Sequence, residues 1–214
     1  MSENLSKLYL IRHGQTCWNQ KKRFQGQTDV DLDEKGFFQA QCIADYFKDK
    51  KVDAIFASDL LRAVHTAVPL SKAKNLPIQT DERLRETRFG LWEGQTFEQI
   101  QKTYPDLVFL WQNKPLQLQI PGGETFLEVA ERSYQAIVEI SLRNIGKHLA
   151  IFCHGGALRL LMCRLLEIPL DKLWHLQQYN AGITIIDLIF DEKVQTFKNC
   201  RPVLTLFNST VHLD

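Results

Sequence analysis

The sequence predicts an α/β fold, a three-layer α/β/α sandwich with a mostly parallel sheet and an antiparallel edge hairpin. Short apolar runs alternate with longer segments of helical periodicity, which is the pattern of strands joined by crossover helices. One run, 149–153 (LAIFC), is apolar almost throughout, as expected for a strand buried on both faces. The tail, 182–197, alternates apolar and polar residues around Asp191-Glu192. This alternation predicts two antiparallel strands at the sheet edge.

The first part of the chain supplies two strand–helix units and a third short strand. Residues 7–11 (KLYLI) form the first expected strand, and a helix with Asp33 as its cap follows to residue 49. Residues 52–57 (VDAIFA) form the second strand. Ser58-Asp59 caps a helix to about residue 75, and a short strand is expected around Ile78.

The middle of the chain, 81–123, is the least periodic stretch. It contains a small helix near 96–103 and a Pro-Gly-Gly turn at 121–123. A long amphipathic helix over 124–145 follows, closed by Gly146. The apolar strand at 149–153 then leads into a helix over 157–166.

Composition limits the kind of protein. The 214 residues contain no internal repeat or linker, so we expect a single domain over 1–214. The 26 basic and 25 acidic residues nearly cancel, which argues against a nucleic-acid or membrane-surface binder. No run is long enough to span a bilayer, and the first residues do not have the pattern of a secretory signal. The five cysteines are an odd number without a CxxC pair, which indicates free thiols and a cytoplasmic protein.

Histidines and arginines follow the predicted strands. Arg12 and His13 end the first strand, Arg62 lies in the first turn after the second, and His154 ends the apolar strand. In open α/β sheets, ligands bind beyond the carboxyl ends of the strands. Any one of these residues could be an ordinary loop or surface residue, but their joint placement predicts a shared cleft.

The residue types in this cleft suit a phosphate. Arginine pairs with phosphate oxygens through a planar fork, and a helix that opens at Gly155-Gly156 favours an anion at its N-terminus. A neutral imidazole can attack phosphorus, and cationic neighbours oppose its protonation. We therefore expect a phosphate site with a nucleophilic histidine.

An ordered set of motifs resembles the histidine phosphatase superfamily, also called the phosphoglycerate mutase-like family. The resemblance covers the chain from Leu8 to about Leu188. Its motifs are RHGQT at 12–16, RFQGQTD at 23–29, SDLLRA at 58–63, LRE at 84–86, GLWEG at 90–94, PGGET at 121–125, and HGG at 154–156 with Arg159. RHG alone is a weak signal, whereas the ordered set is highly specific. The resemblance implies the fold of that family.

The resemblance also implies a role for each site residue. His13 would be the nucleophile that becomes a phosphohistidine. Glu86 would protonate the leaving oxygen and then activate water, because a nearby phosphate favours the protonated carboxyl group. The other residues would hold the phosphoryl group or line the cleft, namely Arg12, Arg62, His154, Asn19, Gln25, Gly26 and Gly155. No metal or other cofactor is implied, since arginines and histidines supply the positive charge.

Only a short segment separates Glu86 from the motif at 121–125, whereas cofactor-dependent mutases of this family carry a longer insertion there. We therefore expect a phosphomonoester phosphatase acting on a small phosphorylated metabolite, as a monomer or homodimer. The alternatives are a phosphoglycerate mutase, an alpha-ribazole phosphate phosphatase, or a non-catalytic binder of a phosphorylated ligand. Residues 89–119 would form the specificity wall, with Phe97, Tyr104, Phe109 and Trp111 available.

Two further patterns need a structural test. Cys153 and Arg159 match the C-x5-R loop of cysteine-dependent phosphatases, and Cys17 and Arg23 match its bare spacing. That mechanism would leave the histidines and Glu86 without a role. In addition, three arginines, at 83, 85 and 88, surround Glu86. They could tether the Glu86 loop or bind a second anion, and tethering is the preferred interpretation.

Overall fold

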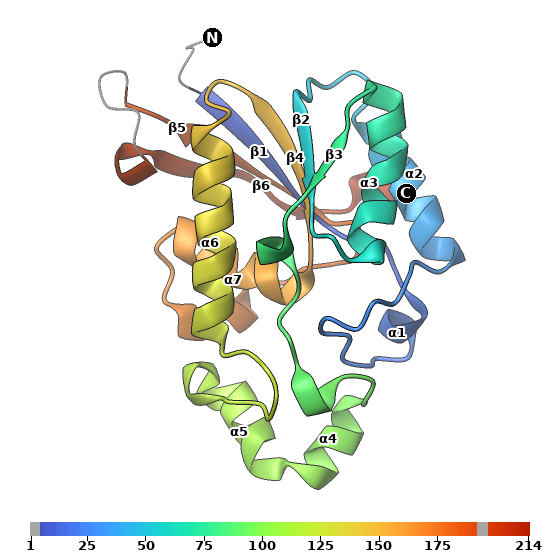
Figure 1. The fold of residues 1–214 in the computed structure, drawn as a ribbon, viewed down its shortest axis with the longest axis vertical. Helices are drawn as coiled ribbons and strands as arrows, with labels where there is room; N and C mark the ends of the chain where they lie inside the picture. Colours follow the sequence, from blue (N-terminus) through green and yellow to red (C-terminus); the bar gives the residue numbers. More distant parts are fainter. Residues whose placement is uncertain (1–4, 192–196) are drawn as a thin grey trace.

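The computed structural model describes residues 5–191 and 197–214. One six-stranded sheet forms the centre, with the order β3-β2-β4-β1-β5-β6 (Figure 1). The first four strands in that order run parallel, β5 is antiparallel to β1, and β6 is antiparallel to β5. This arrangement confirms the predicted fold class. The strands are β1 (Leu5–Arg12), β2 (Ala54–Ala57), β3 (Ile78–Thr80), β4 (His148–Cys153), β5 (Ile183–Ile189) and β6 (Arg201–Ser209).

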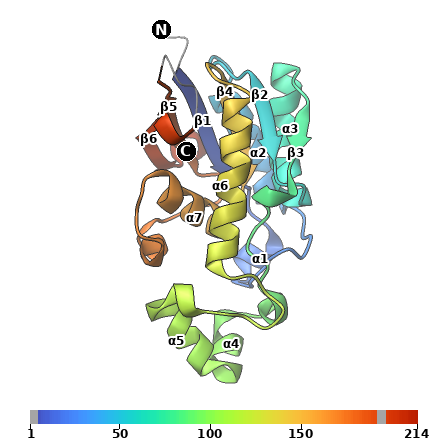
Figure 2. The ribbon, with the colours of Figure 1, turned by 60° about the vertical axis from the view of Figure 1, so that its left-hand side comes forward.

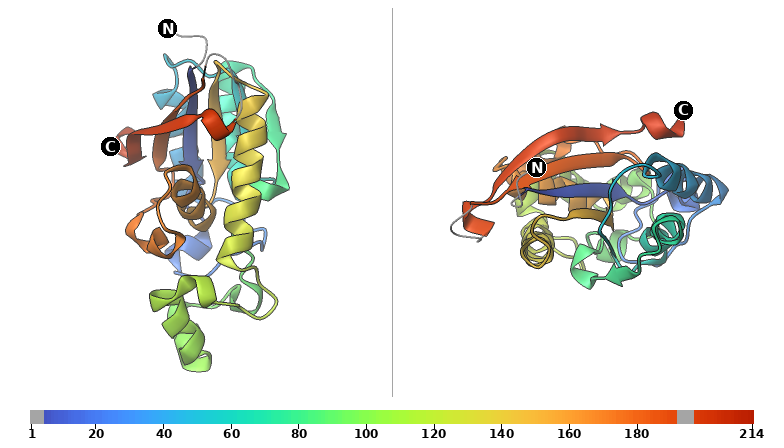
Figure 3. Two further views of the ribbon diagram at one scale, coloured as in Figure 1. Left: turned by 90° about the vertical axis from the view of Figure 1, so that its left-hand side faces the viewer. Right: turned by 90° about the horizontal axis from the view of Figure 1, so that it is seen from above.

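Helices cover both faces of this sheet, as Figure 3 shows from above. Helices α2 (Glu34–Tyr46) and α3 (Leu61–Lys74) pack on one face. Helices α6 (Phe126–Leu142) and α7 (Gly155–Leu165) pack on the other.

The central strands alternate between these two packed layers. In β1, Leu8 and Leu10 join the core under α6 and α7, whereas Tyr9 and Ile11 join the core under α2 and α3. Successive side chains of a strand point to opposite faces, so a strand covered on both sides is apolar at every position. The same holds for 149–153, whose side chains are fully buried. Two buried layers thus hold β1 and β4 rigidly at the centre.

Two helix starts illustrate how local sequence sets these elements. Asp33 caps α2 as predicted, because its carboxylate accepts a hydrogen bond from Gly36 N. Helix α6 begins after Thr125, slightly later than expected, in a capping box between Thr125 and Glu128.

The predicted cap of α3 is wrong. The helix begins at Leu61 after Leu60, which has no side-chain cap. The Asp59 carboxylate pairs with Arg85 instead, and the Ser58 hydroxyl accepts from Leu60 N.

A layer of short helices lies beyond the carboxyl ends of the parallel strands (Figure 2). Helix α4 (Phe97–Thr103) was predicted, whereas α5 (Pro105–Asn113) and α1 (Cys17–Gln20) were not. Pro105 at the first position of α5 is the signal that could have revealed that helix. The short 3-10 helices are η1 (Glu82–Leu84), η2 (Gly90–Trp92), η3 (Pro115–Gln117), η4 (Leu170–His175), η5 (Phe197–Asn199) and η6 (Val211–Leu213).

The structure confirms an antiparallel pair of strands at the sheet edge, but the second strand lies further along the chain than predicted. Strand β5 matches the first half of the expected segment. Residues 192–196, where the rest was expected, lie outside the described residues, and Phe197 belongs to η5. The antiparallel partner of β5 is β6, further along the chain.

None of the helices in the described part of the chain combines the length and the hydrophobicity that crossing a bilayer requires.

Candidate active site

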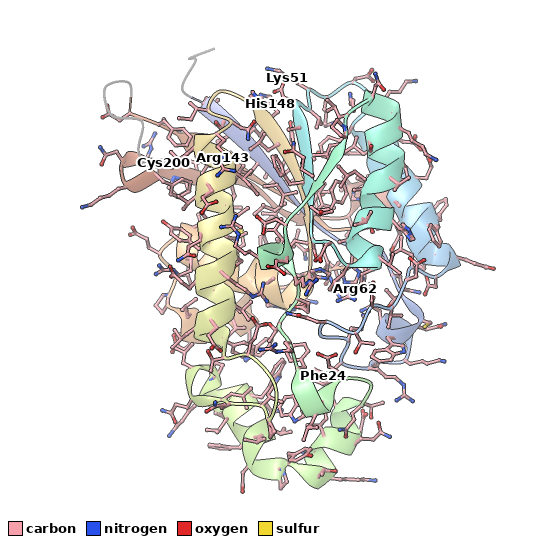
Figure 4. All side chains as sticks on the ribbon, in the orientation of Figure 1. Phe24, Lys51, Arg62, Arg143, His148 and Cys200 are labelled. Atoms are coloured by element: carbon pink, nitrogen blue, oxygen red, sulfur yellow. The ribbon has the colours of Figure 1, made fainter. Side chains whose placement is uncertain are left out.

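A cleft opens at the carboxyl ends of β1 and β4, where parallel α/β sheets place their ligands. Every predicted site residue except His154 lines this cleft, and the His154 ring lies beside that of His13, with 5.2 Å between the ring centroids. Figure 4 shows Arg62 just past the end of the sheet and Phe24 further out, toward α4. The fold thus brings together residues from separate strand ends.

His13 follows β1 and is only 2% exposed. Its Nδ1 lies 2.7 Å from the carbonyl oxygen of Gly14, which can only accept, so Nδ1 carries the proton. Nε2 therefore keeps a free lone pair. Burial lowers the pKa of His13 well below its usual range, and the charges of Arg62 and Arg12 lower it further. The imidazole is therefore neutral at neutral pH.

Arg62 is fully buried in the first turn of α3. Its Nη2 donates to the carbonyl oxygen of Gly26 at 2.6 Å, and its Nη1 donates to that of Thr28 at 2.9 Å. Its Nε donates to Nδ1 of His154 at 3.2 Å. Burial lowers the pKa of Arg62 from its usual value, while nearby carboxylates, Glu86 first, oppose that shift. The guanidinium group is thus held in one orientation.

Two buried donors beside His13 have no hydrogen-bond partner in the structure. Because His154 accepts at Nδ1, its proton lies on Nε2, which is buried and unpaired. Nε of Arg12 is also buried and unpaired, although Nη1 donates to the carbonyl oxygen of Gln178 at 2.7 Å. Burial lowers the pKa of Arg12 to about 10, so its charge persists at pH 7. Unsatisfied buried donors are costly, and an anion would supply the missing acceptors.

Glu86 lies at the N-terminus of α7. Its two carboxylate oxygens accept from Gly156 N at 2.9 Å and from Ala157 N at 3.0 Å, and one also accepts from Thr87 N. A Cβ atom at position 156 would lie 2.5 Å from the Glu86 carboxylate, so a larger residue there would displace this carboxylate. This contact places the carboxyl group of Glu86 at the cleft wall.

The loop after β1 contributes Asn19, Gln25 and Gly26. The Asn19 side-chain oxygen accepts from Thr16, and the buried Gln25 oxygen accepts from the Thr16 hydroxyl. Gly26 has a φ of +56°, a conformation that favours glycine, and it presents its carbonyl oxygen to Arg62. These residues fix the shape of the loop at the His13 end of the cleft.

The segment that carries Glu86 is tied down by arginines. Arg132 of α6 donates to the carbonyl oxygens of Arg83, Arg85 and Glu86, and it pairs with the Glu124 carboxylate. The side chain of Arg85 pairs with Asp59, and that of Arg83 pairs with Asp81 and Glu139. The preferred tethering interpretation is therefore confirmed for Arg83 and Arg85.

Neither cysteine of the alternative phosphatase motif occupies the cleft. Cys153 is buried in the core, where its thiol donates to the carbonyl oxygen of Leu84. Burial raises the pKa of Cys153 to about 12, so it is not a thiolate at neutral pH. Cys17 is exposed, and it is not among the cleft residues.

The outer end of the cleft was only partly anticipated. Of the residues proposed for the specificity wall, Trp111 lines the cleft, whereas Phe97 and Tyr104 pack against the core and Phe109 is exposed. Arg159 and Phe24 were predicted only as positions within motifs, and Trp174 was not predicted at all, although all three line the cleft. Arg159 lies one helical turn after Gly155 on α7, and that spacing could have indicated its position.

Asn180 is another residue that the sequence did not reveal. Its amide group donates to the carbonyl oxygens of His13 and Gly14 and to the Asn19 side chain. It therefore joins the backbone at His13 and Gly14 to the Asn19 side chain. No motif marks it, because it comes from the connection before β5.

Comparisons with known proteins agree with this geometry. Residues 8–201 match the model of the histidine phosphatase superfamily, branch 1. A putative phosphoserine phosphatase 2 of Hydrogenobacter thermophilus is 35% identical over 91% of this chain and 96% of its own length. A mycobacterial glucosyl-3-phosphoglycerate phosphatase superposes with a TM-score of 0.88 at 31% identity, over 96% and 100% of the two chains. A phosphoserine phosphatase of Entamoeba histolytica, solved with 3-phosphoglyceric acid, gives 0.82 at 31% identity, over 97% and 99%.

Proposed function

The chain belongs to branch 1 of the histidine phosphatase superfamily, and from this we propose that it hydrolyses small phosphomonoesters through a phosphohistidine at His13. We further propose that residues 1–214 act as one catalytic domain. The relatives named as phosphatases of phosphoserine and of glucosyl-3-phosphoglycerate support a phosphatase of small metabolites.

One observation carries the proposal. The free Nε2 lone pair of His13 lies among buried donors, and two of them, Arg12 Nε and His154 Nε2, have no partner. A phosphoryl group attacked by His13 would provide oxygen acceptors for both. Preorganised donors of this kind stabilise charge that develops on the transferring group without further reorganisation.

The reaction then proceeds in two steps. Nε2 of His13 forms a bond to phosphorus while the bond from phosphorus to the alcohol oxygen breaks, and Glu86 donates a proton to the departing oxygen. In the second step, the Glu86 carboxylate takes a proton from water, and the resulting hydroxide attacks the phosphohistidine. Inorganic phosphate leaves, His13 is free again, and Glu86 is again protonated.

Rapid quenching with a 32P-labelled phosphomonoester tests this mechanism. We expect an acid-labile, base-stable label on the protein, which a phosphohistidine gives. The label should be absent from the His13→Ala variant and present in Cys153→Ser, which should keep most of its activity. Labelling that survives in His13→Ala but disappears in Cys153→Ser would falsify the histidine mechanism, and no label in any variant would favour a non-catalytic binder.

The mutase alternative is tested separately. With 3-phosphoglycerate and 2,3-bisphosphoglycerate together, we expect release of inorganic phosphate. Conversion of 3-phosphoglycerate into 2-phosphoglycerate without phosphate release would instead show a mutase.

We also propose that the protein acts in the cytoplasm. All five cysteines are free, at positions 17, 42, 153, 163 and 200. Free thiols are typical of a reducing compartment.

A further inference from the structure

We propose that the preferred substrate is a phosphomonoester whose alcohol part carries a flat apolar ring, and that Phe24, Trp111 and Trp174 bind this ring. We call these three residues the aromatic wall. The inference rests on the proposed phosphatase function and adds the class of leaving group to it.

The aromatic wall forms the outer side of the same cleft that holds His13. Its members come from three separate segments: the loop after α1, helix α5 and the 3-10 helix η4. All three side chains are half-buried, so each presents part of a ring to the cleft. Water-facing aromatic surface beside a buried phosphate site is costly unless a ligand covers it.

The wall is rigid before any ligand arrives. The rings of Phe24 and Trp111 lie 5.4 Å apart between centroids, and those of Trp111 and Trp174 lie 4.4 Å apart. The indole nitrogen of Trp174 donates to the carbonyl oxygen of Trp111 at 2.8 Å. Behind them, Trp92 and Phe126 are buried and contact the wall ring to ring. A ring of the substrate would therefore meet a preformed surface, at little cost in ordering side chains.

The charged residues at the rim of the cleft indicate which substituents the substrate ring can carry. Arg159 donates Nε to the carbonyl oxygen of Leu176, and its guanidinium carbon lies 5.6 Å from the centroid of the Trp174 ring. Lys22 and Arg23 line the same cleft. The Glu86 carboxylate is the one acidic group among the cleft residues. A neutral or anionic ring suits this rim, whereas a cationic substituent would be repelled.

A small polar alcohol fits the wall less well. Serine or glycerate attached to the phosphate would reach the outer cleft with polar groups, and would cover little of the aromatic surface. This chain should therefore differ in preference from the relatives named as phosphoserine phosphatases.

The experiment compares kcat/KM for 2-phenylethyl phosphate, ethyl phosphate and O-phospho-L-serine. The first two release primary alcohols of similar reactivity, so their ratio measures the contribution of the ring rather than the chemistry. Burying one ring predicts a preference for the phenylethyl ester on the order of tenfold to hundredfold. O-phospho-L-serine should be the poorer substrate by a comparable factor.

Variants then locate the preference. In Trp111→Ala and in Trp174→Ala, the ratio of kcat/KM for 2-phenylethyl phosphate to that for ethyl phosphate should fall close to one. The ratio does not depend on the fraction of folded enzyme, so a loss of stability in these variants does not obscure the result. Phe109→Ala is the matched control, because Phe109 lies on α5 two residues before Trp111 but is 56% exposed and outside the cleft. It should keep the wild-type ratio.

The outcomes separate the two proposals. The ring inference is overturned if the wild-type protein hydrolyses the phenylethyl and ethyl esters with equal kcat/KM, or if O-phospho-L-serine is its best substrate. Either result leaves the phosphatase proposal standing. A ratio that persists in both tryptophan variants also overturns the ring inference. No hydrolysis of any ester and no phosphohistidine would overturn the phosphatase proposal, and the inference with it.

Discussion

Arg62 donates a hydrogen bond from Nε to Nδ1 of His154 at 3.2 Å, and this single contact fixes the proton of His154 on Nε2. Arg62 thus does more than supply charge, because it also sets the tautomer of the neighbouring imidazole. The other two nitrogens of the guanidinium group are held by the loop carbonyls of Gly26 and Thr28. One side chain therefore connects α3, the loop after β1 and the end of β4.

This relationship predicts that Arg62→Lys is not a conservative change. An ammonium group cannot make the three fixed bonds, so the buried acceptors lose partners and the donor for a phosphoryl oxygen is displaced. We expect kcat to fall by about a hundredfold or more, and the free energy of unfolding to fall by roughly 1–3 kcal/mol. Steady-state kinetics and urea unfolding measure both quantities. Wild-type kcat in a stably folded Arg62→Lys protein would contradict this role.

The proposed acid role of Glu86 predicts a dependence on the leaving group. In Glu86→Gln, esters of alkyl alcohols should react about 10²–10⁴ times more slowly, because the departing alkoxide needs a proton. An ester of 4-nitrophenol, which leaves without that help, should be affected far less in the rate of phosphohistidine formation. Burst-phase kinetics with an alkyl ester and the 4-nitrophenyl ester measure the rate of phosphohistidine formation for each. An equal loss for the two esters would show that Glu86 has a different role.

Arg132 is expected to act as a positioning residue for Glu86. It donates to three carbonyl oxygens of the segment that ends at Glu86, but it is not among the cleft residues. Arg132→Met should therefore reproduce part of the leaving-group pattern of Glu86→Gln, with a greater loss for alkyl esters. Arg132→Lys should restore a fraction of the activity. Arg164→Met is the control, since Arg164 lies outside the cleft, where it makes an exposed ion pair with Glu131 and stacks over the Tyr134 ring. If Arg132→Met slowed both kinds of ester equally, its role would be structural only.

Stability should fall as the pH falls below about 6.5, the usual pKa of an unfolded histidine. In the folded protein, burial lowers the pKa of both His13 and His154 well below that value. The unfolded chain then binds protons that the folded chain does not, so acid favours unfolding. Each imidazole contributes a slope of about 1.4 kcal/mol per pH unit between the two pKa values.

Urea unfolding between pH 8 and pH 5 measures this slope. In His154→Asn, the slope of the unfolding free energy against pH should be smaller by the contribution of one imidazole. His148 and His212, whose pKa values are also lowered by burial, contribute equally in both proteins. A slope unchanged by His154→Asn would count against the linkage.

Much of this architecture could be predicted because its causes are local. The apolar runs at 7–11 and 149–153 follow from strands covered on both faces, and the Asp33 cap is a short-range hydrogen bond. The strand-end positions of His13 and His154 then follow from the topology.

The remaining features depend on contacts between distant segments. Asp59 does not cap α3 because Arg85, from another loop, takes its carboxylate. The wall residues Phe24 and Trp174 each contact the ring of Trp111 on α5. Asn180, from the connection before β5, donates to the carbonyl oxygen of His13. No spacing of residues in the sequence predicts these long-range contacts.

The position of β1 has a consequence for how the protein is made. Strand β1 is synthesised first, yet its neighbours are β4 and β5, and Lys7 pairs with His148 and Asp187. At ribosomal speeds, this strand waits on the order of ten seconds for its partners. During that time, an apolar strand with two open edges is exposed to chaperones and to other nascent chains. The sheet that carries the cleft can therefore close around β1 only after β4 and β5 have been synthesised.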